Sequence, residues 1–85
     1  MPVISIFDGI KIEMYYDDHN PPHFHATYGG RLAIINIKQC CVMKGSLPSK
    51  QLWKVLEWTE VKQCELMKNW ELARIHKELI DIKPL

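Results

Sequence analysis

The sequence has 85 residues and only three cysteines, and neither their number nor their spacing is that of a disulfide-stabilised small domain. Cys40 and Cys41 are adjacent, Cys64 stands alone, and no C-x-x-C pattern occurs. An odd count without that spacing fits neither a disulfide framework nor a zinc ribbon. We therefore expect reduced thiols in a cytoplasmic protein.

The sequence also lacks an excess of charge, a long apolar run and a leader segment. Its 11 basic residues oppose 10 acidic ones, for a formal net charge of +1, whereas nucleic-acid-binding domains gather lysine and arginine into a patch. No apolar run approaches the roughly 18–20 residues that span a membrane. The N-terminus has no basic segment followed by an apolar one, so we expect no signal peptide. The charge does not support nucleic-acid binding, and we expect no membrane span.

What is present is the composition of an ordinary globular domain. Hydrophobic residues make up 47% of the chain and charged residues 25%, which argues against intrinsic disorder. The length favours one compact domain over residues 1–85. Within it, residues 1–44 have strand-like patterning, and residues 45–85 contain a helical stretch and a short tail.

Two β-hairpins are predicted in the first half of the chain. Asp8-Gly9 and Gly29-Gly30 are both typical of tight turns between antiparallel strands. The strands are expected over residues 3–7, 10–16, 23–28 and 31–37 or 31–38, with a short fifth strand over 40–43. Two-residue turns place Val3 opposite Met14 in the first hairpin and His25 opposite Ile34 in the second.

The second half of the chain predicts helix. Residues 45–49 form the boundary, and residues 50–75 contain neither glycine nor proline. Apolar side chains in this stretch fall on two faces, and a second apolar face is more than one helix in a small monomer needs. The second face consists of Trp58, Val61 and Leu72. Either the helix bends near Thr59 into two packed segments, or this second face meets a partner.

These patterns together predict an α+β fold. Two β-hairpins build an antiparallel sheet of four to five strands, and one face of that sheet is packed by a C-terminal long helix or helix pair.

The run Asp17-Asp18-His19-Asn20-Pro21-Pro22-His23-Phe24-His25 holds the densest group of chemically versatile side chains. Strand alternation puts His23 and His25 on one face, within about 7 Å of each other, and His19 can fold back towards them. Three uses remain open: a divalent-metal site, acid–base catalysis with Asp18 as the carboxylate, or a structural or partner-binding role. No nucleophile motif, phosphate-binding glycine loop or H-E-x-x-H helix accompanies the run, so we expect no cofactor other than that metal.

Several of these residues resemble a known family. They are Met-Pro-x-Ile at the start, Asp18 to His25, the Gly-Gly turn, Trp-Glu-Leu-Ala-Arg at 70–74 and Ile-Lys-Pro-Leu at 82–85, and the family is the small bacterial domain of unknown function 4160. The resemblance implies a prokaryotic, cytosolic protein, often encoded beside a second small protein, and therefore one component of a two-gene toxin–antitoxin-like pair. Such a two-gene arrangement is also compatible with another kind of obligate complex. The resemblance places the binding site at His19, Pro21, Pro22, His23, Phe24 and His25 without assigning an activity.

Two hypotheses for the function follow. The first is a small protein-binding module, with a protein partner or a second copy of the chain meeting Trp58, Val61 and Leu72. The alternative is a small His-dependent, metal-assisted hydrolase or nuclease. Its metal or catalytic residues would be His19, His23 and His25, with Asp18 as a further catalytic candidate. Whether the protein is an enzyme stays open at this point.

Overall fold

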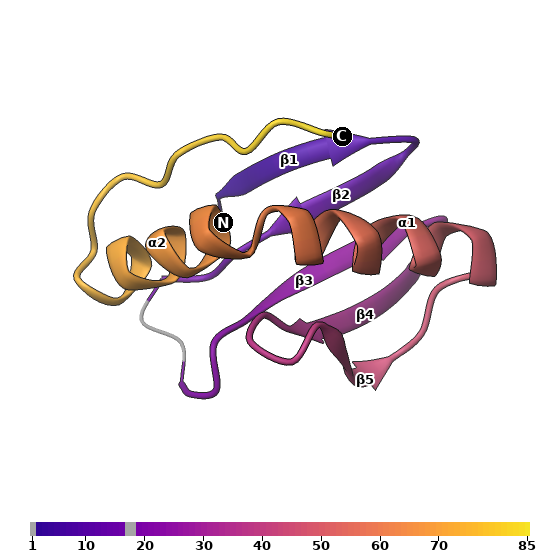
Figure 1. The fold of residues 1–85 in the computed structure, drawn as a ribbon, viewed down its shortest axis with the longest axis horizontal. Coiled ribbons are helices and arrows are strands. Elements are labelled where there is room, and N and C mark those ends of the chain that lie inside the picture. The colour runs from indigo at the N-terminus through magenta and orange to yellow at the C-terminus, as the bar shows by residue number, and fades with distance from the viewer. Residues whose placement is uncertain (1, 17–18) are drawn as a thin grey trace.

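Five antiparallel strands form one sheet in chain order. Helix α1 lies across one face of the sheet, and α2 lies at one end of it (Figure 1). The computed structural model describes residues 2–16 and 19–85. The elements are β1 (Val3–Phe7), β2 (Ile10–Glu13), β3 (His23–Tyr28), β4 (Arg31–Asn36), β5 (Cys41–Gly45), α1 (Ser49–Val61) and α2 (Gln63–Arg74). The predicted α+β class, the antiparallel sheet and the helix pair are confirmed.

The two hairpins differ in how closely they follow the predicted register. The β3–β4 pairing matches it along the whole hairpin, including His25 opposite Ile34. In the β1–β2 pairing an irregularity after Val3 pairs that residue with Glu13, so its predicted pairing with Met14 was wrong. An extra residue in one strand breaks the two-residue alternation of side chains. Ile4 is accordingly buried while Ile6 is 63% exposed.

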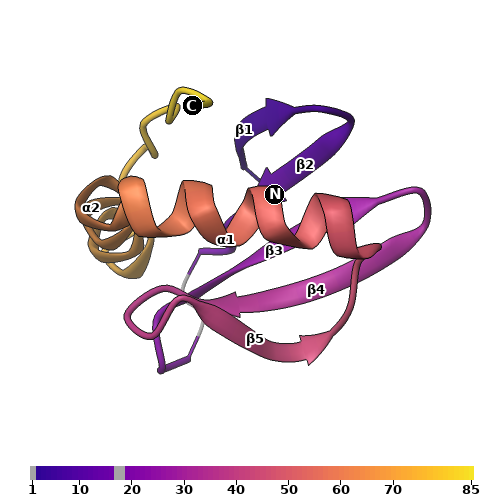
Figure 2. The same ribbon diagram turned by 45° about the vertical axis from the view of Figure 1, so that its right-hand side comes forward.

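The helical stretch divides into two helices at Lys62, three residues beyond the expected bend at Thr59. The Lys62 backbone (φ −98°, ψ 16°) leaves the helical range while its N–H still donates to the Trp58 carbonyl oxygen at 2.8 Å. Figure 2 shows α2 turned away from the axis of α1. Neither helix in the described ranges is long and apolar enough to cross a membrane.

Each helix buries a single stripe of side chains, and this corrects the prediction of a second apolar face. The buried residues are Val55, Trp58 and Thr59 in α1, and Leu66, Asn69, Trp70 and Ala73 in α2. Trp58 follows Val55 by three positions in α1, so the two side chains share the buried face of that helix. Trp58 is fully buried and cannot meet a partner, whereas Val61 is 62% exposed and Leu72 is half-buried.

The core lies between the helices and the inner face of the sheet, with Trp58 at its centre. The Trp58 ring lies perpendicular to the Phe24 ring of β3, with the ring centroids 5.7 Å apart. It also packs at 5.2 Å against Phe7 at the end of β1. One side chain thus joins α1 to both hairpins.

The segment after α2 returns along β1 and is fastened there by hydrogen bonds (Figure 1). The Ile82 N–H donates to the Ile4 carbonyl oxygen at 2.8 Å. Asn69 of α2 is buried and bonds twice to Ile80. Its Nδ2 donates to the Ile80 carbonyl oxygen at 2.7 Å, and its Oδ1 accepts from the Ile80 N–H at 2.9 Å. The tail therefore packs against its own chain.

We predict that Asn69→Ala lowers the free energy of unfolding by about 2 kcal/mol, because two part-buried backbone groups of Ile80 lose their partners. Urea unfolding followed by tryptophan fluorescence measures the change. The control is Lys68→Ala, the adjacent exposed position of α2, which should shift the free energy by less than about 0.5 kcal/mol. Equal losses in the two variants would contradict the role given to Asn69.

Candidate functional site

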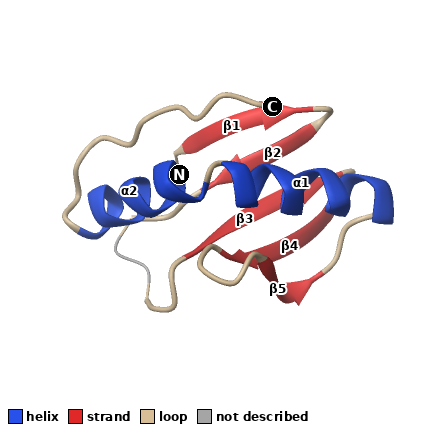
Figure 3. Ribbon diagram, in the orientation of Figure 1, coloured by secondary structure: helices blue, strands red, loops and turns tan. Residues whose placement is uncertain are grey.

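The candidate site lies on the open face, meaning the face of the sheet opposite α1 (Figure 3), at the end of the sheet that α2 reaches. Strand pairing arranges its side chains in rows that run across the sheet. The rows are Ile6, Lys11, Thr27 and Leu32; then Val3, Glu13, His25, Ile34 and Lys44; then His23, Asn36 and Cys41. The two strand histidines therefore lie in adjacent rows on the same face, as alternation predicted.

The first histidine of β3 is held in a fixed orientation. The Nδ1 atom of His23 lies 2.7 Å from the Pro21 carbonyl oxygen. A carbonyl oxygen can only accept, so Nδ1 carries the proton, and in the neutral ring Nε2 carries the lone pair. The His23 side chain is only 6% exposed, and its ring packs at 5.2 Å against Trp70 of α2. The imidazole is thus both buried and oriented by the proline loop.

The other two histidines are arranged around this fixed ring. The centroid of His23 lies 5.9 Å from that of His19 and 5.7 Å from that of His25, both pairs meeting at 64°. His25 is half-buried, and Tyr15 stacks on it almost parallel, with centroids 4.3 Å apart. His19, which is exposed, approaches from the loop. The structure therefore brings together the three histidines that the sequence singled out.

A pocket of about 480 Å³ opens at these rings. Its lining consists of Tyr15, His19, His23, His25, Ile34, Met43 and Lys44, and we call it the histidine pocket. A register shift in the β4–β5 pairing after Ile34 leaves Met43 without a place in the pairing and sets Lys44 opposite Ile34. Three strands and the loop before β3 therefore all contribute to the pocket.

The remaining predicted site residues have other positions. Phe24 points away from the pocket into the core. Pro22 is buried, and its carbonyl oxygen accepts from the Ile37 N–H at 3.0 Å. Pro21 is exposed and contributes its carbonyl oxygen to His23. Asp18, the predicted carboxylate, lies outside the described residues, as does Asp17.

Three residues at the site were not singled out as functional from the sequence. Tyr15 was treated as an ordinary strand residue and Trp70 as helix packing, although Trp70 belongs to the segment that carried the family resemblance. Lys44 had no local signal, because its place depends on the irregular β4–β5 pairing.

The metal hypothesis requires nitrogen atoms to converge on one point. Within residues 2–16 and 19–85, no three His, Cys, Asp or Glu side chains form a group that could hold a metal ion. To bind one ion, His19, His23 and His25 would have to rearrange until a nitrogen of each lies at the usual nitrogen–metal distance of about 2.0–2.1 Å. Metal binding stays a prediction.

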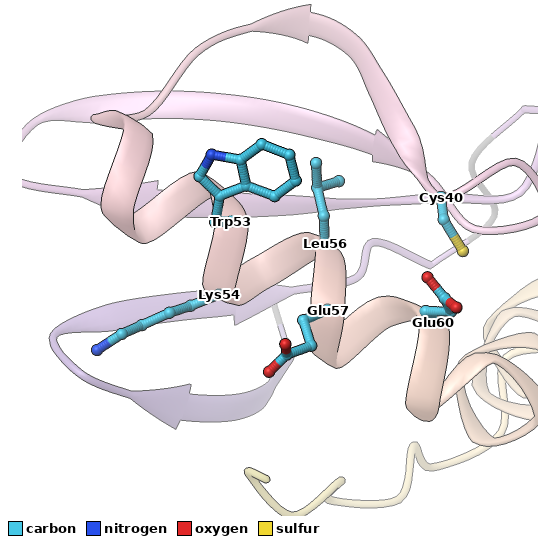
Figure 4. Close-up of a pocket in the computed structure, with 6 residues that line it drawn as sticks. All are labelled: Cys40, Trp53, Lys54, Leu56, Glu57 and Glu60. Carbon is cyan, nitrogen blue, oxygen red and sulfur yellow. The ribbon is translucent and has the colours of Figure 1, made fainter.

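A second hollow, of about 410 Å³, lies beside α1 (Figure 4). Cys40 and Glu60 point towards one another there, and Trp53 is 73% exposed. Burial raises the pKa of the Cys40 thiol, and the carboxylate of Glu60 and the neighbouring Cys41 raise it further. A thiol with a raised pKa stays protonated at neutral pH and is a poor nucleophile. This hollow therefore does not add a catalytic cysteine.

These features define a small α+β protein with α1 across one face of its sheet and a histidine pocket on the other. The chain belongs to the family described as domain of unknown function (DUF4160), whose model matches residues 9–71. The matched segment includes every residue that lines the histidine pocket. The segments at either end that contributed to the resemblance lie outside it. No curated protein and no solved structure shows significant similarity to the chain.

We predict that iodoacetamide at pH 8 modifies Cys40 more slowly than Cys41 and Cys64, which are exposed, because a raised pKa lowers the thiolate fraction at a given pH. Peptide mapping by mass spectrometry measures each rate. Glu60→Gln should speed the reaction of Cys40 by less than about tenfold, since burial remains the larger cause. Glu57→Gln, one turn earlier, is the control. A Cys40 that reacts as fast as Cys41 in the unmodified protein would contradict the assignment.

Proposed function

We propose that this protein is a small protein-binding module and one component of a two-gene toxin–antitoxin-like pair, and that it binds its partner through the open face. The observation that carries the proposal is the position of α1 across one face of the sheet, while the opposite face bears exposed apolar side chains. The family resemblance, which implies a second small protein encoded beside this one, supports the same function.

The apolar side chains of the open face lie at both ends of one row. Ile6 on β1 is 63% exposed and Leu32 on β4 is 45% exposed, with Lys11 and Thr27 between them. Met43 adds a further exposed apolar side chain from β5. Apolar side chains grouped on one face and interrupted by polar ones are typical of a protein-interaction surface. Because Trp58 lies in the core, the second helix face of Trp58, Val61 and Leu72 is the weaker candidate for this surface.

The charges on the open face favour a different chain over a second copy. In the rows defined above, Lys11 and Lys44 outnumber the single acid, Glu13. In a two-fold symmetric dimer the same patch meets itself, so this excess of positive charge would face its own copy. A partner that presents carboxylates among apolar side chains complements both features of the face. We therefore propose an acidic, amphipathic surface on the second protein.

We predict that Leu32→Glu weakens the complex with the product of the neighbouring gene at least about tenfold, because it puts a carboxylate in the apolar part of the contact. Calorimetry measures the affinity, and size-exclusion chromatography with light scattering measures the mass. The control is Val61→Glu, an equally drastic change at an exposed position on α1, which should leave the affinity unchanged.

Two outcomes would overturn the proposal. The absence of a complex between the unmodified proteins at high micromolar concentration would remove the binding function. Loss of the complex in Val61→Glu but not in Leu32→Glu would move the interface to the helices.

A second candidate function is a His-dependent, metal-assisted hydrolase or nuclease at the histidine pocket. The observation that favours it is the hydrogen bond from His23 Nδ1 to the Pro21 carbonyl oxygen. Proteins orient metal-binding histidines and general bases by such a bond, since it fixes the lone pair on Nε2. His19 and His25 would supply the further ligands.

For this second candidate we predict about one zinc or similar ion per chain in protein purified without chelators. Elemental analysis should find that ion lost in the double variant His23→Ala plus His25→Ala. His76→Ala, which changes a histidine outside the pocket, should retain it. Metal-free protein, together with an unchanged cellular phenotype of the double variant, would remove the candidate.

A further inference from the structure

The histidine pocket is rich in groups that attract an anion. His19, His23, His25 and Lys44 can each carry a positive charge, and Tyr15 adds a hydroxyl donor. None of the described residues that line the pocket is acidic. Glu13 is the Cα partner of His25 and continues the same row away from Lys44. The positive side of the pocket is therefore the side formed by β4 and β5.

Lys44 decides between an anion and a metal cation as the ligand. An ammonium group has no lone pair to offer a metal. Placed on the pocket wall, it repels a cation and attracts an anion. The orientation of His23 is compatible with this, because a protonated ring can donate from Nδ1 to Pro21 and from Nε2 into the pocket.

The shape of the lining narrows the class of anion. Donors approach from separate elements: His19 from the loop, His23 from β3 and Lys44 from β5. A phosphate monoester has three terminal oxygens that can accept from several directions, whereas a carboxylate has two. Ile34 and Met43 form an apolar part of the lining, suited to an apolar or planar substituent. The volume of about 480 Å³ is that of a small-molecule site.

We propose that the histidine pocket binds a small organic phosphate monoester. Its phosphoryl group lies between the histidines and Lys44, and its substituent lies against Ile34 and Met43. This function goes beyond partner binding and belongs to the isolated chain. Measured without the partner, its failure leaves the protein-binding proposal standing, and failure to form a complex leaves the phosphate proposal standing.

The test is a titration of the isolated chain with phenyl phosphate, followed through the imidazole signals in NMR spectra. We expect saturable shifts for His19, His23 and His25. His76 lies outside the pocket lining and serves as the internal reference, with no saturable shift. Benzoate, which has the same ring but a carboxylate, should bind at least about tenfold more weakly because it offers fewer acceptors.

Matched lysine variants separate pocket binding from general electrostatic attraction. Lys44→Ala should weaken phenyl phosphate binding about tenfold or more, the effect of one lost charge-assisted hydrogen bond. Lys11→Ala removes the same charge from a neighbouring row of the open face outside the pocket, and should change the affinity by less than about twofold. His19→Gln, at an exposed position, should also weaken binding without unfolding the chain.

Several results would overturn the proposal. Equal losses of phenyl phosphate affinity in Lys44→Ala and Lys11→Ala would show that the binding depends on net charge and not on the pocket. Equal affinity for benzoate would show that the pocket accepts a carboxylate as readily as a phosphate, and the phosphate assignment would fail. Saturable Zn²⁺ binding at the three imidazoles, with no response to phenyl phosphate, would make the pocket a metal site.

Discussion

The packing of Phe24 against Trp58 is the contact on which the rest of this structure depends. Trp58 joins α1 to both hairpins through Phe24 and Phe7. Because Phe24 lies on the inner face, strand alternation places its neighbours His23 and His25 on the open face. The same residue pair that closes the core therefore decides where the imidazoles point.

The two prolines complete the positioning that the core begins. Neither has a backbone N–H, so their polar backbone groups are acceptors only. The Pro22 carbonyl oxygen continues the β3–β4 ladder through Ile37, and the Pro21 carbonyl oxygen accepts from His23. The Ile37 N–H and the His23 Nδ1–H thus both find acceptors at the point where the chain enters β3. The orientation of His23 thus follows from a local feature of the sequence, the Pro-Pro-His order.

The features that could be predicted from the sequence are those set by residues close together in the chain. The β3–β4 register followed from Gly29-Gly30 and alternation alone, and the shared face of His23 and His25 followed with it. The pairing of Val3 failed because an irregularity in the first strand shifts the register without any glycine or proline to mark it.

The same distinction explains the burial of Trp58 and the place of Lys44. No helix-breaking residue marks Lys62, so a bend near Thr59 was only one of two alternatives, and the single buried stripe of each helix could not be placed from the sequence. The entry of Lys44 into the pocket depends on pairing between β4 and β5, which only the folded sheet decides. Asp18 lies outside the described residues, so its role as the catalytic carboxylate stays a prediction.

Lys44 connects the two functions proposed for the open face. It lies in a row of that face and also lines the histidine pocket, so an acidic partner and a phosphate monoester would both use its charge. A group already paired with one anion attracts a second anion less strongly, and the phosphate itself repels carboxylates nearby. Binding linkage is reciprocal, so each ligand would lower the affinity for the other by the same factor. A phosphate-sensitive complex is therefore the joint consequence of placing one lysine at both the pocket wall and the partner surface.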